Sequence, residues 1–311
     1  MSARRRAHGL RARWRLARQA TRRYREVFGR RPRLLLALNH SERLHRVKVL
    51  RRDPRHALLA DKVEAKAWIA SRVGEEYVIP TLYAGRRLPR RRRRRTWPRP
   101  LFVKAAHGSG KAWNVRVPAE GPARWGRVER KVHTWLTTSY GGKGGEWHYG
   151  AMPRRVLVEP HIGDPERLPD DYQLWVFHGR VHFVQWHTDR GTPSFGVRYV
   201  DRDWTEAFRS TKFRLHERMP PKPQSWDTMV WIAETLGRDF PFVRVDLYEV
   251  DGHPYVGELT FTPTAGFHRF EPPETDRMLG RLWRKPRVPR HPATPRPEVA
   301  RAEARVGSAR G

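Results

Sequence analysis

Two segments near the C-terminal end of the chain alternate between apolar and polar residues, and a turn sequence separates them. The segments are residues 243–247 (VRVDL) and 257–261 (GELTF). A period of two is typical of a β-strand that buries one face and leaves the other polar. The pattern places Arg244 and Asp246 on one face of the first strand, and Glu258 and Thr260 on one face of the second.

The connection between these strands decides whether their polar faces coincide. A two-residue turn at Asp251-Gly252 would set Asp246 opposite Gly257, which pairs a polar position with an apolar one. A three-residue loop would set Asp246 opposite Glu258. Because a slip of one residue would bury the charges, we predict the three-residue loop or an equivalent β-bulge. Two carboxylates and a hydroxyl then converge beside Arg244.

Carboxylates that face each other directly repel, and a divalent cation between them is a natural reason for such an arrangement. Only hard oxygen ligands are on offer at Asp246, Glu258 and Thr260, which favours Mg²⁺. Bound Mg²⁺ usually retains some water and contacts phosphate. The alternative interpretation is a solvated hairpin face on which Arg244 neutralises Asp246, and the spacing alone leaves both open.

A glycine-rich loop with the sequence HGSGK follows a predicted strand. The backbone N–H groups of Gly108, Ser109 and Gly110 can cradle a phosphate, because small residues let the main chain approach closely. Lys104 and Lys111 flank the loop. It is not a Walker A loop, since no Ser or Thr follows the lysine and a strand is predicted next. A plain hairpin turn is the alternative, and it also stays open.

Helices interspersed with hairpins predict a mixed α+β fold. The predicted helices cover residues 61–74, 122–138 and 225–236. The predicted strands cover residues 101–105, 114–117, 155–159, 172–177 and 181–186, followed by the hairpin of residues 242–262.

The positive charge is concentrated in three appendages. The chain carries a formal net charge of +32, of which residues 1–34 contribute +12, residues 86–99 contribute +9 and residues 281–311 contribute +7. We therefore divide the chain into a basic N-terminal extension (1–34), a nearly neutral body (35–283) with an Arg-rich insertion (86–99), and a basic, Pro-rich tail (284–311) that we expect to be disordered. Such segments bind nucleic acid or anionic lipid, or are merely solvated.

Six consecutive arginines, Arg90 to Arg95, are expected not to pack, because like charges repel and prolines flank them. The first 30 residues are expected to form a basic helix. The chain has no cysteine, which excludes disulfides and thiol nucleophiles and fits a reducing cytoplasm. Its longest plain apolar run, at residues 34–38, is far shorter than the roughly 20 residues of a membrane span.

Five segments, taken in their order along the chain, resemble sequences of the ATP-grasp superfamily. Within that superfamily the likeness is to the TupA-like branch, which is associated with teichuronopeptide and other bacterial cell-surface polysaccharides. The segments are DKVEAKAWIASRVGEEYVIP, FVKAAHGSG, WLTTSYGGKGGEWHY, DFPFVRVDLYEVDG and GELTFTPTAGF. The likeness covers roughly residues 55–283. It implies an ATP-grasp fold, in which two α+β lobes with antiparallel sheets grip ATP.

The resemblance also implies which residues bind the nucleotide. They are Lys62, Lys104, Gly108, Ser109, Gly110, Glu159, Ile162 and Asp171. The two lysines are expected at the phosphates, with the glycine loop lying over them. Glu159 begins the segment, ending at Ile162, that is expected to read adenine through its backbone, and Asp171 is expected near the ribose.

For the chemistry, the resemblance implies that Asp246, Glu258 and Thr260 hold Mg²⁺. Arg244 is implied to stabilise charge on the transferring phosphoryl group, and Lys104, which contacts the phosphates, is counted with it as catalytic. The sequence departs from the family pattern at one of these positions and at one further position: Thr260 stands where relatives usually carry Asn, and Gln173 stands where TupA-like members commonly carry Lys.

The leading hypothesis is therefore an ATP- and Mg²⁺-dependent carboxylate–amine ligase that acts through an acyl phosphate in cell-surface polysaccharide synthesis. Its expected partners are glycan or amino-acid substrates. We expect a cytoplasmic enzyme, held at the inner membrane face through its basic arms. One alternative is an ATP-dependent phosphotransferase. Another is an inactive ATP-grasp body whose arms bind nucleic acid, with Trp97 stacking on bases.

Overall fold

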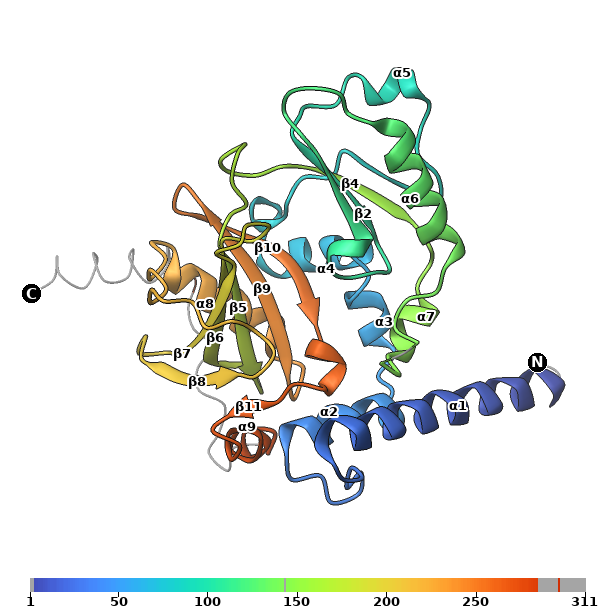
Figure 1. The fold of residues 1–311 in the computed structure, drawn as a ribbon, viewed down its shortest axis with the longest axis vertical. Helices are drawn as coiled ribbons and strands as arrows, with labels where there is room; N and C mark the ends of the chain where they lie inside the picture. The colour runs from blue at the N-terminus through green and yellow to red at the C-terminus, as the bar shows by residue number, and fades with distance from the viewer. Residues whose placement is uncertain (1–2, 143, 285–295, 297–311) are drawn as a thin grey trace, which may run out of the picture.

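In the computed structural model, residues 3–142, 144–284 and 296 are described, and they form two lobes (Figure 1). Each lobe is built on an antiparallel sheet with helices beside it. This confirms the predicted α+β class and the two lobes. The Pro-rich tail lies almost wholly outside the described residues.

The strands of the smaller lobe are β1 (Tyr83–Gly85), β2 (Leu101–Ala105), β3 (Asn114–Val117) and β4 (Val156–Pro160). Those of the larger lobe are β5 (Asp171–Phe177), β6 (Arg180–Thr188), β7 (Gly196–Asp201), β8 (Glu206–Ser210), β9 (Val243–Val250), β10 (His253–Thr260) and β11 (Phe270–Glu271). The α-helices are α1 (Ala3–Phe28), α2 (His40–Val49), α3 (Arg55–Leu59), α4 (Glu64–Val73), α5 (Arg91–Arg94), α6 (Trp125–Thr137), α7 (Trp147–Ala151), α8 (Trp226–Gly237) and α9 (Thr275–Leu282). Short 3₁₀ turns cover Glu75–Tyr77, Lys111–Trp113 and Pro263–Gly266.

The four-stranded sheet of the small lobe has the order β1-β4-β2-β3 and packs against α6. Alternation along β2 sends Val103 into the core, where it joins Val128 and Trp135 of the helix. The same alternation leaves Lys104 on the opposite face of the sheet, together with Glu159 of β4. The pleat of this sheet therefore fixes where two predicted site residues lie.

The seven-stranded sheet of the large lobe has the order β10-β9-β5-β6-β7-β8-β11. One face is apolar: Leu174, Val245 and Leu247 pack with residues of α8 and α4 in the largest core cluster. The opposite face carries buried polar side chains on β5, β6 and β9. A sheet that buries polar groups on one face requires partners for them there.

The hairpin of β9 and β10 differs from the predicted loop and agrees with the predicted pairing. Its turn has two residues, Asp251 and Gly252, both with positive φ (52° and 73°), so the three-residue loop is wrong. A β-bulge between Val256 and Glu258 supplies the extra residue instead. Beyond it Asp246 lies opposite Glu258, and Arg244 lies opposite Thr260. The bulge alternative is confirmed.

Helix α4 joins the two lobes. Its residues Ala65, Ile69 and Val73 pack in the core of the large lobe. Its polar side faces the small lobe, where Lys66 Nζ lies 2.5 Å from Glu159 Oε1 and Glu64 Oε1 accepts a hydrogen bond of 2.8 Å from Arg155. The connection is therefore apolar on one side and ionic on the other.

The arginine run packs more closely than expected. Residues 91–94 form one helical turn, α5, and Arg94 is only 5 % exposed because it turns inward. Its guanidinium lies 2.6 Å from Glu129 Oε1 and over the ring of Trp125. Trp97 is buried in the core of the small lobe, so it is not free to stack on bases. The expectation that the arginine run cannot pack is wrong for Arg94. In a helical turn the four arginine side chains point in different directions, so that one of them can turn inward while the others stay in solvent.

The predicted basic helix at the N-terminus is present as α1, which ends at Phe28. Ala20 and Tyr24 are buried, and the Tyr24 hydroxyl shares a hydrogen bond of 3.1 Å with Ser41. Within the described residues, no helix combines the length and apolarity that crossing a membrane requires.

Candidate active site

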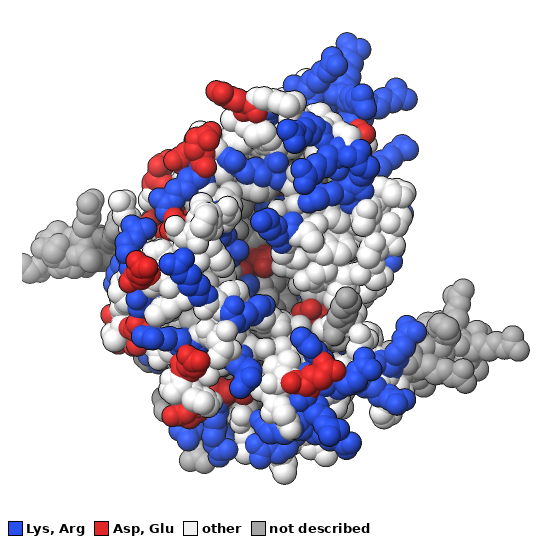
Figure 2. All heavy atoms as spheres, viewed as in Figure 1, with Lys and Arg blue, Asp and Glu red and all other residues white. Residues whose placement is uncertain are grey.

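The polar face of the large sheet carries a straight row of oxygen-bearing side chains across three strands. Gln173 of β5 pairs with Asp246 of β9, which in turn pairs with Glu258 of β10. The face looks toward the small lobe, and a hollow opens between the lobes in Figure 2. The register of the bulged hairpin thus brings the predicted carboxylates together.

Arg244 binds the first of these carboxylates through two hydrogen bonds. Its Nε and Nη2 lie 2.7 and 2.6 Å from the two oxygens of Asp246, and Nη2 also donates to Thr260 Oγ1 at 3.2 Å. Asp246 and Arg244 are both buried, so the pair is not a solvated hairpin face. Burial raises the pKa of Asp246 well above its usual range, although Arg244 opposes this.

Lys62 connects the second carboxylate to the glycine loop. Its ammonium lies 3.2 Å from Glu258 Oε2 and donates a hydrogen bond of 2.8 Å to the carbonyl of Gly108. Burial alone would raise the pKa of Glu258, but the charges of Lys62 and Arg244 outweigh it and lower that pKa to about 2. Glu258 is therefore ionised throughout the physiological pH range.

The glycine loop presents two free backbone donors rather than three. The Gly108 N–H donates to the carbonyl of Ala105 at 3.4 Å, whereas the N–H groups of Ser109 and Gly110 have no partner within the described part of the chain. A Cβ at Gly108 would lie 2.6 Å from the ring of Trp113, so packing requires glycine there. The loop therefore has two N–H groups to offer a phosphate, one fewer than predicted.

Lys104 and Glu159 meet on the inner face of the small lobe, and a second lysine joins them. The two oxygens of Glu159 lie 2.5 Å from Lys104 Nζ and 2.5 Å from Lys66 Nζ. These ammonium groups lower the pKa of Glu159 although burial opposes ionisation. Lys66 was not predicted. It lies four residues after Lys62, one helical turn away, and that spacing was the available signal.

Asp171 lies at the edge of the same polar face and is held by Arg190, which was also not predicted. Arg190 donates to one oxygen of Asp171, and Gln173 donates to that oxygen at 2.8 Å. The other oxygen of Asp171 and Oε1 of Gln173 are buried without a hydrogen-bond partner among the described residues. Such oxygens indicate a missing donor or cation. Arg190 lies in a loop, and a loop has no side-chain periodicity from which its position could be predicted.

Ile162 lies in the segment that leaves the small lobe for the large one. It is half-buried, and neither its N–H nor its carbonyl has a hydrogen-bond partner in the part of the chain that the structure describes. A free donor and acceptor on the main chain are what reading a base edge requires. The role of Ile162 stays a prediction.

The donor set fits a hard divalent cation bound jointly by protein and phosphate. Asp246 and Glu258 face each other, and each carboxylate oxygen keeps a second lone pair beyond its present contacts. In the described ranges, no group of three or more acidic, His or Cys side chains is arranged to hold a metal. Two protein carboxylates with substrate oxygens completing the shell is the usual arrangement for Mg²⁺.

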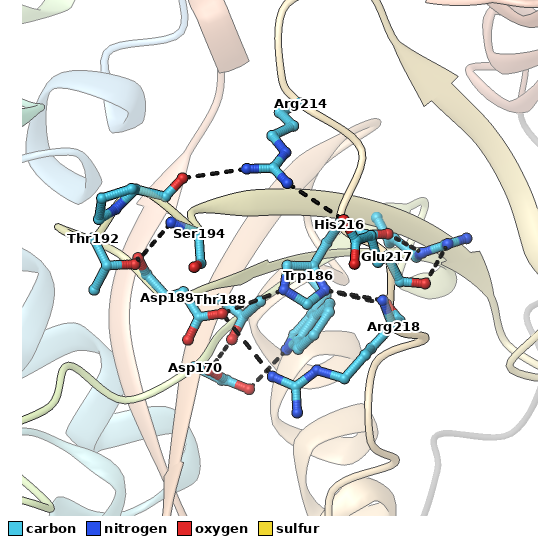
Figure 3. A network of polar contacts seen from close by, with 12 residues as sticks. Asp170, Trp186, Thr188, Asp189, Thr192, Ser194, Arg214, His216, Glu217 and Arg218 are labelled. Carbon is cyan, nitrogen blue, oxygen red and sulfur yellow. Dashed lines mark hydrogen bonds and ion pairs between the residues drawn. The ribbon is translucent and has the colours of Figure 1, made fainter.

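A separate polar network braces the loops beside this face (Figure 3). Asp170 accepts hydrogen bonds from Trp186 Nε1 at 3.0 Å and from Thr188 Oγ1 at 2.7 Å. His216 Nε2 lies 3.3 Å from Asp189 Oδ2, beside a cavity of about 270 Å³. Because the charged groups of this network already pair with one another, it supports the start of β5 and the end of β6 rather than forming a second site.

Comparison with known proteins places the chain in one family. The profile of TupA-like ATP-grasp proteins matches residues 42–284. Among solved structures, D-alanine–D-alanine ligase from Bacillus anthracis is 14 % identical, with 66 % of this chain and 57 % of that chain covered at a TM-score of 0.40. The ATP-grasp ligase PsnB is 14 % identical, with 74 % and 61 % covered at 0.41. The D-cycloserine synthetase DcsG is 18 % identical, with 67 % and 63 % covered at 0.38. The chain thus spans less than two thirds of each of these proteins. No curated protein matches.

Proposed function

Because this chain belongs to the TupA-like ATP-grasp family, we propose that it is an ATP- and Mg²⁺-dependent ligase that joins a carboxylate to an amine. In the proposed reaction a carboxylate oxygen attacks the γ-phosphorus of ATP, so that ADP leaves and an acyl phosphate forms. An amine then attacks the acyl carbon, inorganic phosphate leaves, and the nitrogen loses a proton as the amide forms.

The observation that carries this proposal is the chain of charged side chains Lys62–Glu258–Arg244–Asp246, which is partly buried at Lys62 and Glu258 and buried at Arg244 and Asp246. Lys62 and Arg244 lie 3.2 and 3.8 Å from Glu258, on opposite sides of its carboxylate. Cations fixed in this way stabilise charge on a transferring phosphoryl group without reorganising during the reaction. We assign that task to Arg244, and we assign the anchoring of the terminal phosphates to Lys62 with the N–H groups of Ser109 and Gly110.

We assign the Mg²⁺ ligands to Asp246 and Glu258, with the Thr260 hydroxyl in support. When bound, the ion supplies positive charge that neutralises phosphate oxygens and orients them for in-line transfer. Thr260 donates a hydrogen bond of 3.2 Å to Glu258 Oε1 and thereby holds the carboxylate in place. Lys104 and Lys66 share a single glutamate, so the inner face of the small lobe keeps an excess positive charge for the nucleotide.

Two cations favour an anionic acceptor substrate. Partial desolvation lowers the pKa of Lys212, and the charge of Arg244, which borders the same space, lowers it further. The Lys212 ammonium lies over the ring of Phe213 and makes no ion pair within the described residues. His187 and His268 in the same space have pKa values lowered by burial, so they are neutral near pH 7 and give no opposing charge. We propose that the substrate carboxylate binds between Arg244 and Lys212.

For the physiological substrate, we propose a uronic-acid carboxylate of a glycan or an amino acid of a bacterial cell-surface polymer. Family membership supports this choice. The decisive experiment is an ADP-release screen with Mg²⁺, ATP, amino acids and uronic-acid-containing acceptors, followed by the mass of the product. An amide product supports the ligase. A stable phosphoester with no requirement for an amine would instead identify a phosphotransferase, and no ADP with any acceptor, together with no binding of ATP, would overturn the proposal.

A further inference from the structure

The loop between α1 and α2 holds two large apolar side chains out in solvent. Leu35 is 79 % exposed and Leu36 is 78 % exposed, although the next residue, Ala37, is buried. Two adjacent leucines in water form a small apolar tip whose hydration is unfavourable. They are the most exposed large hydrophobic side chains among residues 14–284, where side-chain exposure is described apart from residue 143.

This tip is held in place and is not a frayed end. The carboxylate of Glu42, itself fully buried, accepts hydrogen bonds from both sides of the loop. Before the leucines, Arg30 Nη1 lies 2.5 Å away and the Arg33 N–H lies 3.2 Å away. After them, the N–H groups of Leu38 and Asn39 donate at 3.1 and 3.2 Å. The loop is thus closed around one carboxylate, with Leu35 and Leu36 at its outer end.

Basic residues lie within the loop and along the helix that precedes it. Arg31 and Arg33 within the loop are exposed. On the preceding helix α1, Arg15, Arg18 and Arg22 are exposed and recur on the side opposite buried Ala20. Trp14, at the border of this basic stripe, is 71 % exposed. Figures 1 and 2 show the helix and the loop along the lower edge of the molecule, where basic side chains gather.

We propose that this surface, Leu35 and Leu36 with the basic stripe of α1, docks on an anionic phospholipid membrane. Arginines attract the headgroups while the leucines and Trp14 enter the interface between headgroups and acyl chains. A second copy of the chain would bring the +12 of residues 1–34 against the same charge. A nucleic acid would satisfy the arginines and leave the two leucines in water. An anionic lipid surface satisfies both, and this inference does not depend on the proposed ligase activity.

The other basic patch of the described structure is not part of this surface. Helix α5, with its exposed arginines, lies at the opposite end of the molecule from α1 in Figure 1. A membrane that contacts the tip therefore meets the large-lobe end, and the small lobe stays in solution. The two patches can be tested separately.

Vesicle co-sedimentation of the full chain tests the docking. Wild-type protein is expected to bind phosphatidylcholine vesicles that contain phosphatidylglycerol and to bind pure phosphatidylcholine weakly. The double variant Leu35→Ser/Leu36→Ser should lower the partition constant by at least about tenfold, because each leucine loses apolar burial. The matched control is Leu50→Ser/Leu58→Ser, since these leucines are 47 % and 48 % exposed in other parts of the chain. Equal vesicle binding by the two double variants would overturn the proposal that Leu35 and Leu36 insert into the membrane.

The absence of cysteine allows a second readout of the same surface. A Leu36→Cys variant labelled with an environment-sensitive fluorophore should show a blue shift on anionic vesicles, and the Leu58→Cys control should show none. Short RNA should fail to displace vesicles from the wild-type protein. Displacement by RNA at comparable phosphate concentration, with no shift at position 36, would identify a nucleic-acid surface and contradict the proposal.

Discussion

At the residue scale, the candidate site rests on four charged side chains that offset one another, of which Arg244 and Asp246 are buried. Arg244 is bound to Asp246 by two hydrogen bonds and also lies near Glu258, while Lys62 approaches Glu258 from the other side. A buried charge that loses its partner is strongly destabilising and shifts its pKa. Each of these side chains therefore has both a chemical and a structural task, and an informative variant must keep the shape of the residue it replaces.

The substitution Glu258→Gln is such a variant. It keeps the volume and removes the charge, so ADP formation should fall by at least about 100-fold because a ligand to Mg²⁺ and the counter-charge of Lys62 are both lost. The rate of ADP release in the presence of acceptor substrates measures this effect. A thermal melt in the same buffer checks that the variant is folded.

The control for this prediction is Glu271→Gln, an exposed glutamate on the edge strand β11. It should leave the rate unchanged within about twofold, as surface substitutions usually do. A Glu258→Gln protein that is folded and retains more than about a tenth of the wild-type rate would contradict the metal assignment.

The sequence predicted the residues of this group well where a periodic pattern placed them. Arg244, Asp246, Glu258 and Thr260 follow from alternation along two strands, and the structure brings them together as paired neighbours. Arg190 could not be found in this way, because it enters the polar face from a loop. Periodicity orients side chains on strands and helices, and it is silent about loops.

At the element scale, the bulge at Gly257 keeps the two carboxylates on one face. The two-residue turn pairs His253 with Val250, a register that would otherwise place Gly257 opposite Asp246. The extra residue at the bulge moves Glu258 into that position. The pairing was predictable because the polar faces had to coincide, whereas the choice between a longer loop and a bulge depends on local backbone geometry.

Enlarging Gly257 should damage the site more than deleting it. A Cβ there would lie 2.7 Å from the ring of Tyr248, so Gly257→Ala should lower the free energy of unfolding by about 1–3 kcal/mol through overpacking. Deletion of Gly257 leaves Glu258 opposite Asp246 in a continuous ladder and should retain ATP binding. Urea unfolding and nucleotide titration measure the two effects.

Gly150→Ala is the matched control, since a Cβ at Gly150 meets nothing within 4 Å. It should leave the free energy of unfolding unchanged or slightly raise it, as Ala favours the helix α7. If deletion of Gly257 abolishes nucleotide binding while Gly257→Ala is harmless, the bulge has a role other than setting the register.

The ionised carboxylate of Glu42 stabilises the loop between α1 and α2, so its contribution to the free energy of unfolding should depend on pH. Burial opposes its ionisation, but hydrogen bonds from Arg30, Leu38, Asn39 and Arg33 lower the pKa of Glu42 from 4.5 to about 2. A lowered pKa in the folded state stabilises the protein above the unfolded value, and this stability is lost as pH falls through the folded value. The contribution is about 3 kcal/mol at pH 7, and it declines between about pH 4.5 and pH 2.

Glu42→Gln should therefore lower the free energy of unfolding by about 3 kcal/mol at pH 7 and by less than half as much at about pH 3. Urea titrations of the variant and the wild type at the two pH values measure the difference. Glu26→Gln on α1 is the control, because Glu26 forms only exposed ion pairs with Arg22 and Arg23 and should cost less than about 1 kcal/mol at either pH. A cost for Glu42→Gln that does not depend on pH would contradict the assignment.

At the scale of the whole molecule, the two lobes have separate apolar cores and an ionic connection. The core of the small lobe contains no residue of the large-lobe core. Between them, Arg155 of the small lobe donates hydrogen bonds of 2.9 Å to Asp61 and 2.8 Å to Glu64. A polar connection between lobes permits relative motion, whereas a shared apolar core would fix them. The family fold could be predicted from the sequence, but this division of contacts could not, because Arg155 and its acidic partners lie more than 90 residues apart in the sequence and share no periodic pattern.

From these contacts we predict that a substitution at Arg155 weakens nucleotide binding and leaves the rate of the chemical step nearly unchanged. Arg155→Met removes the two hydrogen bonds that Arg155 makes between the lobes and changes none of the groups assigned to phosphoryl transfer. The KM for ATP should rise by about tenfold, because the lobes are less well positioned before binding, and kcat should change by less than about twofold.

The neighbouring Arg154→Met is the control, since Arg154 donates only within the small lobe, to Ser139 at 2.9 Å and to the Leu136 carbonyl at 3.3 Å. Small-angle scattering without ATP should give a larger radius of gyration for Arg155→Met alone. A fall in kcat at unchanged KM would instead place Arg155 in the reaction itself, and the same KM rise in both variants would show that the interlobe contacts are not its cause.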